Sequence, residues 1–491
     1  MKRAKRSPAT TALVALLLSL LFASGLVSDE GNLSDPAAYE QDAGTKIDSP
    51  SQVVAPHWGV LHADQQRTDS LSVRGVRSNP VIFFDKRDTD LAAFSGTMVG
   101  PQNETSLGIG GKLYRCLGPG PISFHPPEGI PLVIGTTSAV EVRHPRTGEI
   151  LGRRKFNLGL FTNFPSVDDQ GFVYVPDWAR LHKFTPGMTE IAWVREFENS
   201  ILRDRLAMVP AGSIGFLPDG NVLVCFLGGL FHVLDKDTGR TLNTFDLNRL
   251  DPPVRPDPQF GFLKIVFRNA IVIEGDELFV LVSGEIIRLV YEEKDHSLRV
   301  VERTKHPGFS SSTPTLDIKR RRLFLVTYDP DDPDRAPSLM CYDTSSVPMK
   351  LRWSIETDIG FFESEDQLTA TYLPSSGVIL NNSLYGHVTA YREVETESGP
   401  LARRLWSTAE TVSERFAAYI ATASDLDNTV YVTDNLVPRL YALDALTGSV
   451  LWSLDLPDRS IKKPVLAPGV VYLDHHRGIL AIVQGTENSG R

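Results

Sequence analysis

The 491-residue chain has few cysteines, which limits the kinds of fold it can adopt. Only Cys116, Cys225 and Cys341 occur. An odd, widely spaced set is not a disulfide framework, although a single bridge remains possible. Each of the three lies in strand-like sequence, which favours the role of a buried, small apolar residue.

The chain also lacks the short motifs of several enzyme classes. It has no glycine-rich phosphate loop after a strand, no Gly-x-Ser-x-Gly elbow and no His-Glu-x-x-His motif. A formal charge of −10 disfavours nucleic-acid binding. Prolines interrupt the acidic residues 328–334, so we expect a solvated loop there rather than a calcium site. His475 and His476 are adjacent on a predicted strand and cannot both face one site.

The N-terminal sequence is typical of a secretion signal. Basic residues at positions 1–6 precede an apolar run at 12–27, and small residues at 23–25 offer a cleavage zone. We therefore expect a signal peptide at residues 1–28 and an exported protein, periplasmic or extracellular. The alternative is an uncleaved membrane anchor, although the apolar run is short for a full span. The polar residues 29–56 predict a flexible linker.

One hairpin pattern recurs along the chain. Residues 440–456 contain two alternating runs separated by an Asp-to-Gly turn, which indicates two half-buried strands. Residues 231–247 repeat the pattern, with Asp235 and Gly239 at the turn. Residues 140–158 repeat it again, with His144 in place of the Asp. A unit that returns at a spacing of ~40–50 residues indicates a repeat architecture.

This hairpin resembles the repeat of pyrroloquinoline-quinone-type β-propellers, whose pattern runs Tyr-x-Leu-Asp-x-x-Thr-Gly-x-x-Leu-Trp. Residues 440–452 match that pattern at nearly every position. The resemblance covers residues 121–484 and implies an all-β fold that forms a single β-propeller. It leaves the activity open, because enzymes and non-catalytic scaffolds share the repeat. Quinone-dependent dehydrogenases of this kind commonly carry two adjacent cysteines over the quinone, a pair that this chain lacks.

Counting the repeats predicts eight four-stranded blades, with seven as the alternative. Residues 462–483 supply about three strands beyond the seven units that can be read directly. We expect residues 107–117 to supply the missing strand, so that strands from both termini close the ring. The expected domains are then a lead-in with the closing strand at 57–120, the propeller at 121–484 and a tail at 485–491. The seven units are expected at residues 121–159, 160–199, 208–247, 262–304, 307–357, 363–408 and 415–456.

Aromatic residues are expected to stabilise the ring. The outer strands carry tryptophans at corresponding positions, which predicts packing between neighbouring blades. Trp58 and His62, in the lead-in, are expected to cap the first blade in a structural role. The four outer-strand tryptophans are Trp193, Trp353, Trp406 and Trp452.

The connections between blades are the candidate binding surface. In a propeller they gather on one face, and loops on a rigid scaffold often carry function. Four of them are long or charged, some basic and others acidic, which predicts a dipolar rim. The candidate partner-binding residues are Arg203, Arg205, Arg255, Glu363, Glu365, Asp366 and Glu414.

The sequence thus predicts an exported, non-catalytic scaffold that binds a protein or an extracellular ligand through one face of the ring. We expect no cofactor, no metal ion and no nucleic acid, and membrane contact only through an uncleaved leader. The alternative is an enzyme, either a quinone-dependent dehydrogenase using pyrroloquinoline quinone and calcium or a calcium-dependent propeller hydrolase. No catalytic residue can be named from the sequence.

Overall fold

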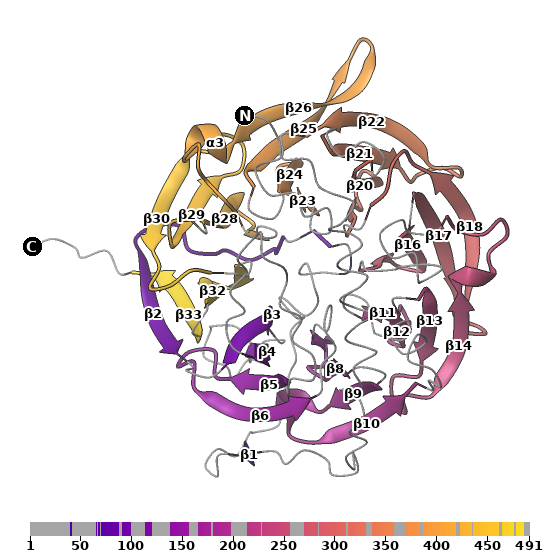
Figure 1. Ribbon diagram of the computed structural model, residues 1–491, viewed down its shortest axis with the longest axis horizontal. Coiled ribbons are helices and arrows are strands. Elements are labelled where there is room, and N and C mark those ends of the chain that lie inside the picture. Colours follow the sequence, from indigo (N-terminus) through magenta and orange to yellow (C-terminus); the bar gives the residue numbers. More distant parts are fainter. Residues whose placement is uncertain are drawn as a thin grey trace, which may run out of the picture.

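Short apolar runs separated by turns form antiparallel strands, and these assemble into eight sheets around a ring (Figure 1). Each sheet is one blade, and the blades follow the chain around the ring. An all-β propeller of eight blades is therefore confirmed. The computed structural model describes residues 40–41, 65, 67–68, 70–87, 91–99, 113–119, 138–156, 165–177, 180–197, 214–226, 228–255, 270–282, 284–310, 313–329, 336–357, 369–382, 386–418, 423–434, 436–460, 464–475 and 478–485.

We number the blades along the chain and give their strands from the ring centre outwards. Blade 1 consists of β3 (Leu91–Val99), β4 (Leu113–Pro119), β5 (Ser138–Arg143) and β6 (Ile150–Phe156), and blade 2 of β7 (Ser166–Val167), β8 (Val173–Asp177), β9 (Arg180–Phe184) and β10 (Ile191–Glu196). Blade 3 consists of β11 (Gly215–Phe216), β12 (Val222–Cys225), β13 (Leu230–Leu234) and β14 (Thr241–Asp246), and blade 4 of β15 (Val272–Glu274), β16 (Glu277–Val282), β17 (Glu285–Glu292) and β18 (Ser297–Lys305). Blade 5 consists of β19 (Thr315–Asp317), β20 (Arg322–Thr327), β21 (Ser338–Asp343) and β22 (Lys350–Glu356), and blade 6 of β23 (Thr369–Leu373), β24 (Val378–Asn382), β25 (Val388–Thr396) and β26 (Gly399–Ser407). Blade 7 consists of β27 (Ala423–Ser424), β28 (Thr429–Asp434), β29 (Arg439–Asp444) and β30 (Val450–Asp455). Blade 8 consists of β31 (Val465–Ala467), β32 (Val470–His475), β33 (Gly478–Gln484) and β2 (Pro80–Arg87). The helical segments among the described residues are the short η1 (Pro186–Met188), η2 (Leu247–Arg249) and α3 (Thr408–Thr411).

The recurring hairpin joins the third strand of a blade to its fourth. In blade 7, Asp444 Oδ1 accepts hydrogen bonds from the backbone N–H groups two and three residues further on, at 3.0 and 2.8 Å. Gly448 ends this turn with a φ of 70°, a conformation that glycine adopts without steric cost. In blade 1, His144 Nδ1 accepts from the equivalent two N–H groups at 3.2 Å. An imidazole nitrogen therefore replaces the carboxylate, and the repeat survives without its Asp.

Blade 8 takes its outermost strand from the N-terminal part of the chain. β2 pairs antiparallel with β33, so strands from both ends of the chain close the ring as predicted. The expectation that residues 107–117 supply the closing strand is wrong, because β4 lies in blade 1 between β3 and β5. A bulge between Ile82 and Phe84 interrupts the alternation of β2 and hides the strand in the sequence. Blade 1 consequently begins at Leu91, well before residue 121.

A buried side-chain contact reinforces the closure. His475, at the end of β32, is fully buried, and its Nε2 atom lies 3.1 Å from Asp85 Oδ1 in β2. Burial lowers the pKa of His475, and the carboxylate of Asp85 opposes that shift. Asp85 also accepts a hydrogen bond from Arg87 Nε at 3.0 Å. The contact connects two strands from opposite ends of the chain; the adjacent His476 lies outside the described residues.

One short strand comes from the predicted linker. β1 (Glu40–Gln41) pairs antiparallel with β6 on the outer edge of blade 1. The predicted signal peptide and the rest of the linker lie outside the described residues, as do Trp58 and His62. In the part of the chain that the structure describes, no helix is long and apolar enough to cross a membrane.

The hydrophobic core lies between neighbouring blades. One cluster joins Phe231 of blade 3 to Val280 of blade 4, and another joins Trp406 of blade 6 to Val432 of blade 7. Because a blade is a single sheet, each of its faces must be buried against the next blade. This arrangement keeps the ring rigid and leaves its outer wall and its connections available for binding.

Candidate functional site

The centre of the ring is crossed by the chain's own lead-in, of which residues 65, 67–68 and 70–76 are described. At one end, Gln65 O accepts a hydrogen bond from Ile273 N in blade 4 at 2.9 Å. At the other end, Arg74 O accepts from Gly469 N in blade 8 at 2.7 Å. Blades 4 and 8 lie opposite each other in a ring of eight, so the segment must pass across the middle (Figure 1).

The middle of this axial segment is deeply buried. Arg67 and Thr68 are almost inaccessible to solvent. Arg67 Nε donates to Ile271 O at 3.0 Å, and Thr68 O accepts from Tyr372 N in blade 6 at 3.2 Å. The segment therefore bonds to the inner strands as part of the buried core, whereas the expected cap by Trp58 and His62 concerns residues outside the described part of the chain.

Close packing fixes the last residues of the axial segment. Gly75 N donates to Asp425 Oδ2 at 3.0 Å, and Tyr431 OH donates to the same oxygen at 2.9 Å. A Cβ atom on Gly75 would lie 2.2 Å from Tyr431 OH, so only glycine fits at this position. Burial, followed by the charge of Asp425, raises the pKa of Tyr431. This phenol stays protonated and serves as a hydrogen-bond donor rather than as a base.

Two of the predicted rim residues lie in the described part of the chain, on connections between blades. Arg255 follows β14, and its guanidinium carbon lies 4.4 Å from the centre of the Phe309 ring, a cation–π contact. Glu414 follows β26, and its backbone O lies 3.2 Å from His387 Nε2. Both side chains are exposed, as binding residues must be. The predicted rim residues outside the described part are Arg203, Arg205, Glu363, Glu365 and Asp366.

Tryptophans join the outer strands to the following blades, which confirms the predicted packing. In blades 2 and 6 the indole Nε1 donates to a backbone carbonyl of the next blade, and in blade 7 it donates to the carbonyl of Val76 ahead of β2, at 2.9 to 3.0 Å. The Trp406 ring lies so close to Gly448 that an added Cβ would come within 2.6 Å of it. Phe84 takes the corresponding place in β2, against Gly148 of blade 1. The donors and acceptors are Trp193 with Lys236, Trp406 with Ala445 and Trp452 with Val76.

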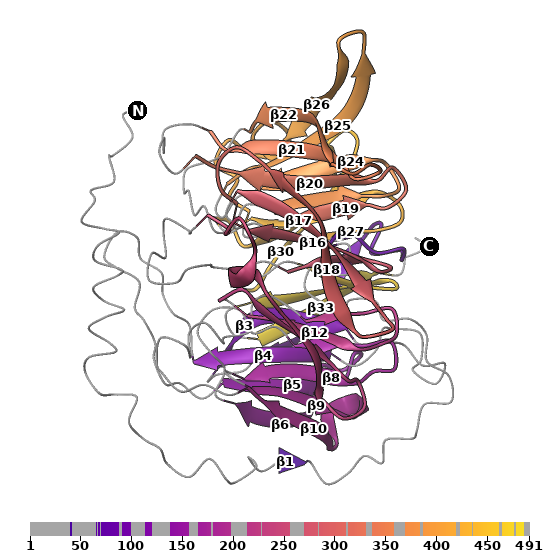
Figure 2. The same cartoon turned by 90° about the vertical axis from the view of Figure 1, so that its right-hand side faces the viewer.

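Trp353 differs, because its partner is a side chain. Its Nε1 donates to Glu393 Oε2 at 2.7 Å. Glu393 lies on β25, in the β25–β26 hairpin that projects from the ring in both views (Figures 1 and 2). The longer hairpin therefore offers a carboxylate to the indole, whereas the other three tryptophans donate to backbone carbonyls.

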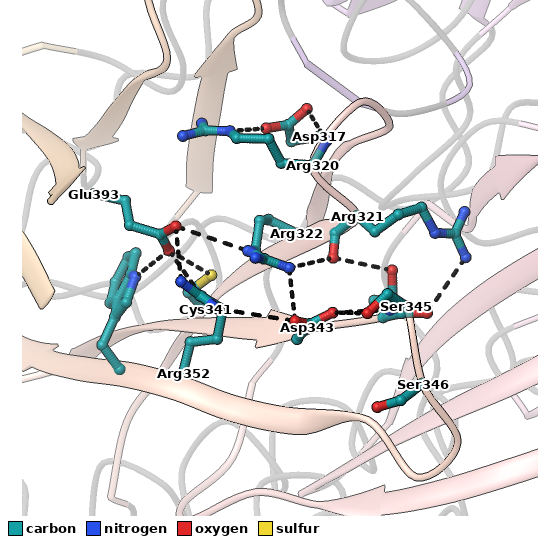
Figure 3. Close-up of polar contacts among 12 residues, drawn as sticks. Asp317, Arg320, Arg321, Arg322, Cys341, Asp343, Ser345, Ser346, Arg352 and Glu393 are labelled. Atoms are coloured by element: carbon teal, nitrogen blue, oxygen red, sulfur yellow. Dashed lines mark hydrogen bonds and ion pairs between the residues drawn. The ribbon is translucent and has the colours of Figure 1, made fainter. Parts of the chain in front are cut away.

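Arginines of blade 5 converge on the same carboxylate (Figure 3). Arg322 Nε lies 3.7 Å from Glu393 Oε1, and Arg352 Nε lies 3.4 Å from Glu393 Oε2. Both guanidinium groups also approach Asp343, at 2.8 and 3.9 Å. Burial raises the pKa of the neighbouring Cys341 thiol well above its usual value. Opposite charges thus compensate one another between blades 5 and 6, and the arrangement offers no activated nucleophile.

The described residues hold few groups suited to redox or metal chemistry. Among them, no cluster of three or more His, Cys, Asp or Glu side chains is arranged to bind a metal ion. Cys225 and Cys341 are buried, free thiols, as predicted. The side chain of Cys116 lies outside the described part. The sequence did not reveal the axial segment or the Glu393 cluster, because both depend on contacts between distant parts of the chain.

Comparison with known proteins connects the C-terminal blades to one family. The family model described as outer membrane protein assembly factor BamB matches residues 386–487, which run from just before β25 to just past β33. No curated protein matches the sequence.

Several solved structures share the architecture. The quinohemoprotein alcohol dehydrogenase ADHIIG from Pseudomonas putida HK5 is 12% identical, with a TM-score of 0.53 over 91% of this chain and 84% of that one. The quinohemoprotein alcohol dehydrogenase from Comamonas testosteroni is 12% identical, with a TM-score of 0.51 over 87% and 80%. BamB from Moraxella catarrhalis is 13% identical, with a TM-score of 0.44 over 93% and 100%. The two dehydrogenase matches show a shared fold and nothing about activity.

Proposed function

Because the chain is a β-propeller of the pyrroloquinoline-quinone-type repeat superfamily, we propose that it is an exported, non-catalytic scaffold that binds a partner protein through one face of the ring. Its blades supply a rigid support, and its connections supply the contacts. The partner is a protein of the cell envelope or of the extracellular space.

The axial segment carries this proposal. A central channel is the one concave region that every blade of a propeller can line. Here Arg67 and Thr68 lie buried beside the innermost strands of blades 4 and 6, within a segment that bonds to blade 8 at the turn after β31 and so covers one end of the ring. A quinone or a substrate that entered the ring from this end would have to displace these residues, which favours a scaffold over a dehydrogenase.

The family match and the leader favour a place in the envelope. Residues 386–487 match the model named for an outer membrane protein assembly factor. The basic start and the apolar run at residues 12–27 have the pattern of a secretion signal. We therefore place the mature protein in the periplasm or outside the cell, where it assists the assembly of other proteins.

The connections between blades are the proposed contact surface. Arg255 is exposed and is held by Phe309, so it presents a positive charge in a defined position. Glu414 is exposed on another connection. Together with Arg203, Arg205, Glu363, Glu365 and Asp366 on the remaining connections, these residues provide both signs of charge for a partner with complementary halves.

A capture experiment with charge variants tests the scaffold. The mature protein, immobilised and exposed to detergent extracts of its own envelope, should retain a defined partner, and retention should fall as salt rises. Reversing Arg203, Arg205 and Arg255 to Glu should reduce retention at least ~10-fold, whereas the Lys versions should retain the partner. The melting temperature should hardly change, because exposed charges contribute little to stability. Equal retention by the folded Glu variant would exclude this face.

The enzyme alternative has its own assay, motivated by the fold shared with quinohemoprotein alcohol dehydrogenases. Purified protein is mixed with pyrroloquinoline quinone and calcium, and reduction of an electron-accepting dye is followed with alcohols and sugars. A second series offers lactones in the presence of calcium, to test for a propeller hydrolase. Turnover in either series would replace the scaffold with an enzyme.

A further inference from the structure

Exposed apolar side chains gather on the outer wall of blades 7 and 8. In β2 three successive residues, Val81, Ile82 and Phe83, are exposed, and Phe83 retains 50% of its accessible surface. The adjacent β30 exposes Val450 and Leu451. We call these five residues the outer apolar patch. Other described outer strands expose at most two large apolar residues, as β10 does with Ile191 and Val194, so the run of three in succession distinguishes β2. Successive exposed apolar residues on one strand mark a candidate interaction site.

The patch includes an open strand edge. Within the described residues β2 pairs with β33 alone, so its other edge presents unpaired backbone groups. Natural sheets protect such edges with charges, prolines or bulges. In β2, Pro80 stands at the start and Lys86 and Arg87 at the end, while the middle is apolar. An edge of this type is suited to pairing with another extended segment.

The neighbouring outer strand already carries such a segment. β1 pairs antiparallel with β6, with Gln41 opposite Gly152 and Glu40 opposite Arg153. Gly152 follows the bulge of β6, as Phe84 follows the bulge of β2. The same wall of the ring thus accepts an added strand just beyond the bulge, with an acidic residue opposite a basic one.

We propose that β2 accepts an extended segment of a partner protein as a fifth strand of blade 8. The partner strand runs antiparallel to β2, as β1 does on β6. Its first residues are acidic and face Lys86 and Arg87, and its later residues are apolar and lie beside Val81, Ile82 and Phe83. Backbone pairing provides affinity, while the charge followed by the apolar patch sets the direction and the sequence preference. This surface is distinct from the charged connections, so it serves a second contact.

A model peptide tests the proposal. The probe is fluorescent Glu-Asp-Val-Thr-Ile-Thr-Val with blocked ends, and the control probe has the same residues in reverse order. The full chain should bind the first peptide in an anisotropy titration and should slow hydrogen exchange at residues 80–87. Phe83→Lys should weaken binding at least ~10-fold. Leu351→Lys should have no effect, because Leu351 is similarly exposed (48%) on β22, on the far side of the ring. Val81→Lys is the second patch variant, used if Phe83→Lys does not fold.

Four results would overturn the proposal. The first is equal binding of both peptides, and the second is unchanged binding by a folded patch variant. Slow exchange of residues 80–87 without any peptide would mean that another part of this chain covers the edge. A dimer that both patch variants dissociate would mean that a second copy occupies it. None of these results bears on the connections, so the proposed scaffold function is judged separately by the capture experiment.

Discussion

Replacing Gly448 by alanine should destabilise the ring, because the added methyl group has no room. The φ angle of Gly448 is 70°, and a Cβ atom would lie 2.6 Å from Cγ and Cδ2 of Trp406. A left-handed conformation costs a residue with a Cβ atom about 1–2 kcal/mol. Over-packing a filled contact adds about 1–3 kcal/mol. We therefore expect the free energy of unfolding to fall by about 2–5 kcal/mol.

Gly275→Ala is the matched control for the backbone cost. Gly275 has a φ of 58°, and nothing lies within 4 Å of its ideal Cβ position, so its loss should stay near 1–2 kcal/mol. In a Trp406→Ala background the clash is removed, and Gly448→Ala should then cost no more than the control. Urea unfolding followed by circular dichroism measures all four variants and gives the coupling energy. If Gly448→Ala costs the same with and without Trp406, the indole does not dock on this turn.

Two further predictions concern buried charge. Burial lowers the pKa of His306 to about 4, so between pH 6.5 and 4 the unfolded chain binds a proton more readily than the folded one. The stability contributed by the neutral imidazole is fully present above pH 6.5 and is lost as the pH falls. The free energy of unfolding of the parent protein should therefore fall by about 2 kcal/mol more between pH 7 and pH 5 than that of His306→Gln. If the urea midpoints of the two proteins shift equally between pH 7 and pH 5, this prediction is wrong. Glu141 and Arg143 are both buried and form an ion pair at 2.8 Å. Glu141→Gln should lower the free energy of unfolding in urea by about 3–5 kcal/mol, because it leaves a buried charge without its partner. The double variant Glu141→Gln with Arg143→Met should regain part of that free energy. A loss below about 1 kcal/mol for Glu141→Gln would mean that the pair is not buried in solution.

The sequence predicts the blades well because each hairpin is specified locally. Asp444 and Gly448 determine the turn through contacts within five residues, and the alternation on either side determines which face is buried. Trp406 and Trp452 could likewise be assigned to packing between blades from their place in the repeat. His144 shows that the turn does not require an Asp at this position, because an imidazole nitrogen accepts the same hydrogen bonds.

The closing strand and the ring centre could not be predicted in the same way. β2 carries a bulge and no turn motif, since its partner β33 lies at the other end of the chain. The axial segment has no periodicity, and its structure depends on hydrogen bonds to blades far along the sequence, such as the one from Gly75 to Asp425. From the sequence alone, Glu393 would be interpreted as a solvated charge on a hairpin. Only the structure shows that the arginines of blade 5 lie beside it. Long-range contacts of this kind leave no local pattern.

Chain connectivity links the closure of the ring to the position of the axial segment. The axial segment leads directly into β2. Between them, Val76 O accepts a hydrogen bond from Trp452 Nε1 at 2.9 Å and lies 3.1 Å from Tyr431 OH. A ligand that displaced the axial segment would therefore break contacts that also hold the closing strand. The axial segment is therefore unsuited to open and close as a gate to the ring, because its movement would displace β2, the strand that completes blade 8. This linkage favours the two proposed contact sites that leave the axial segment in place, the connections around Arg255 and Glu414 and the open edge of β2.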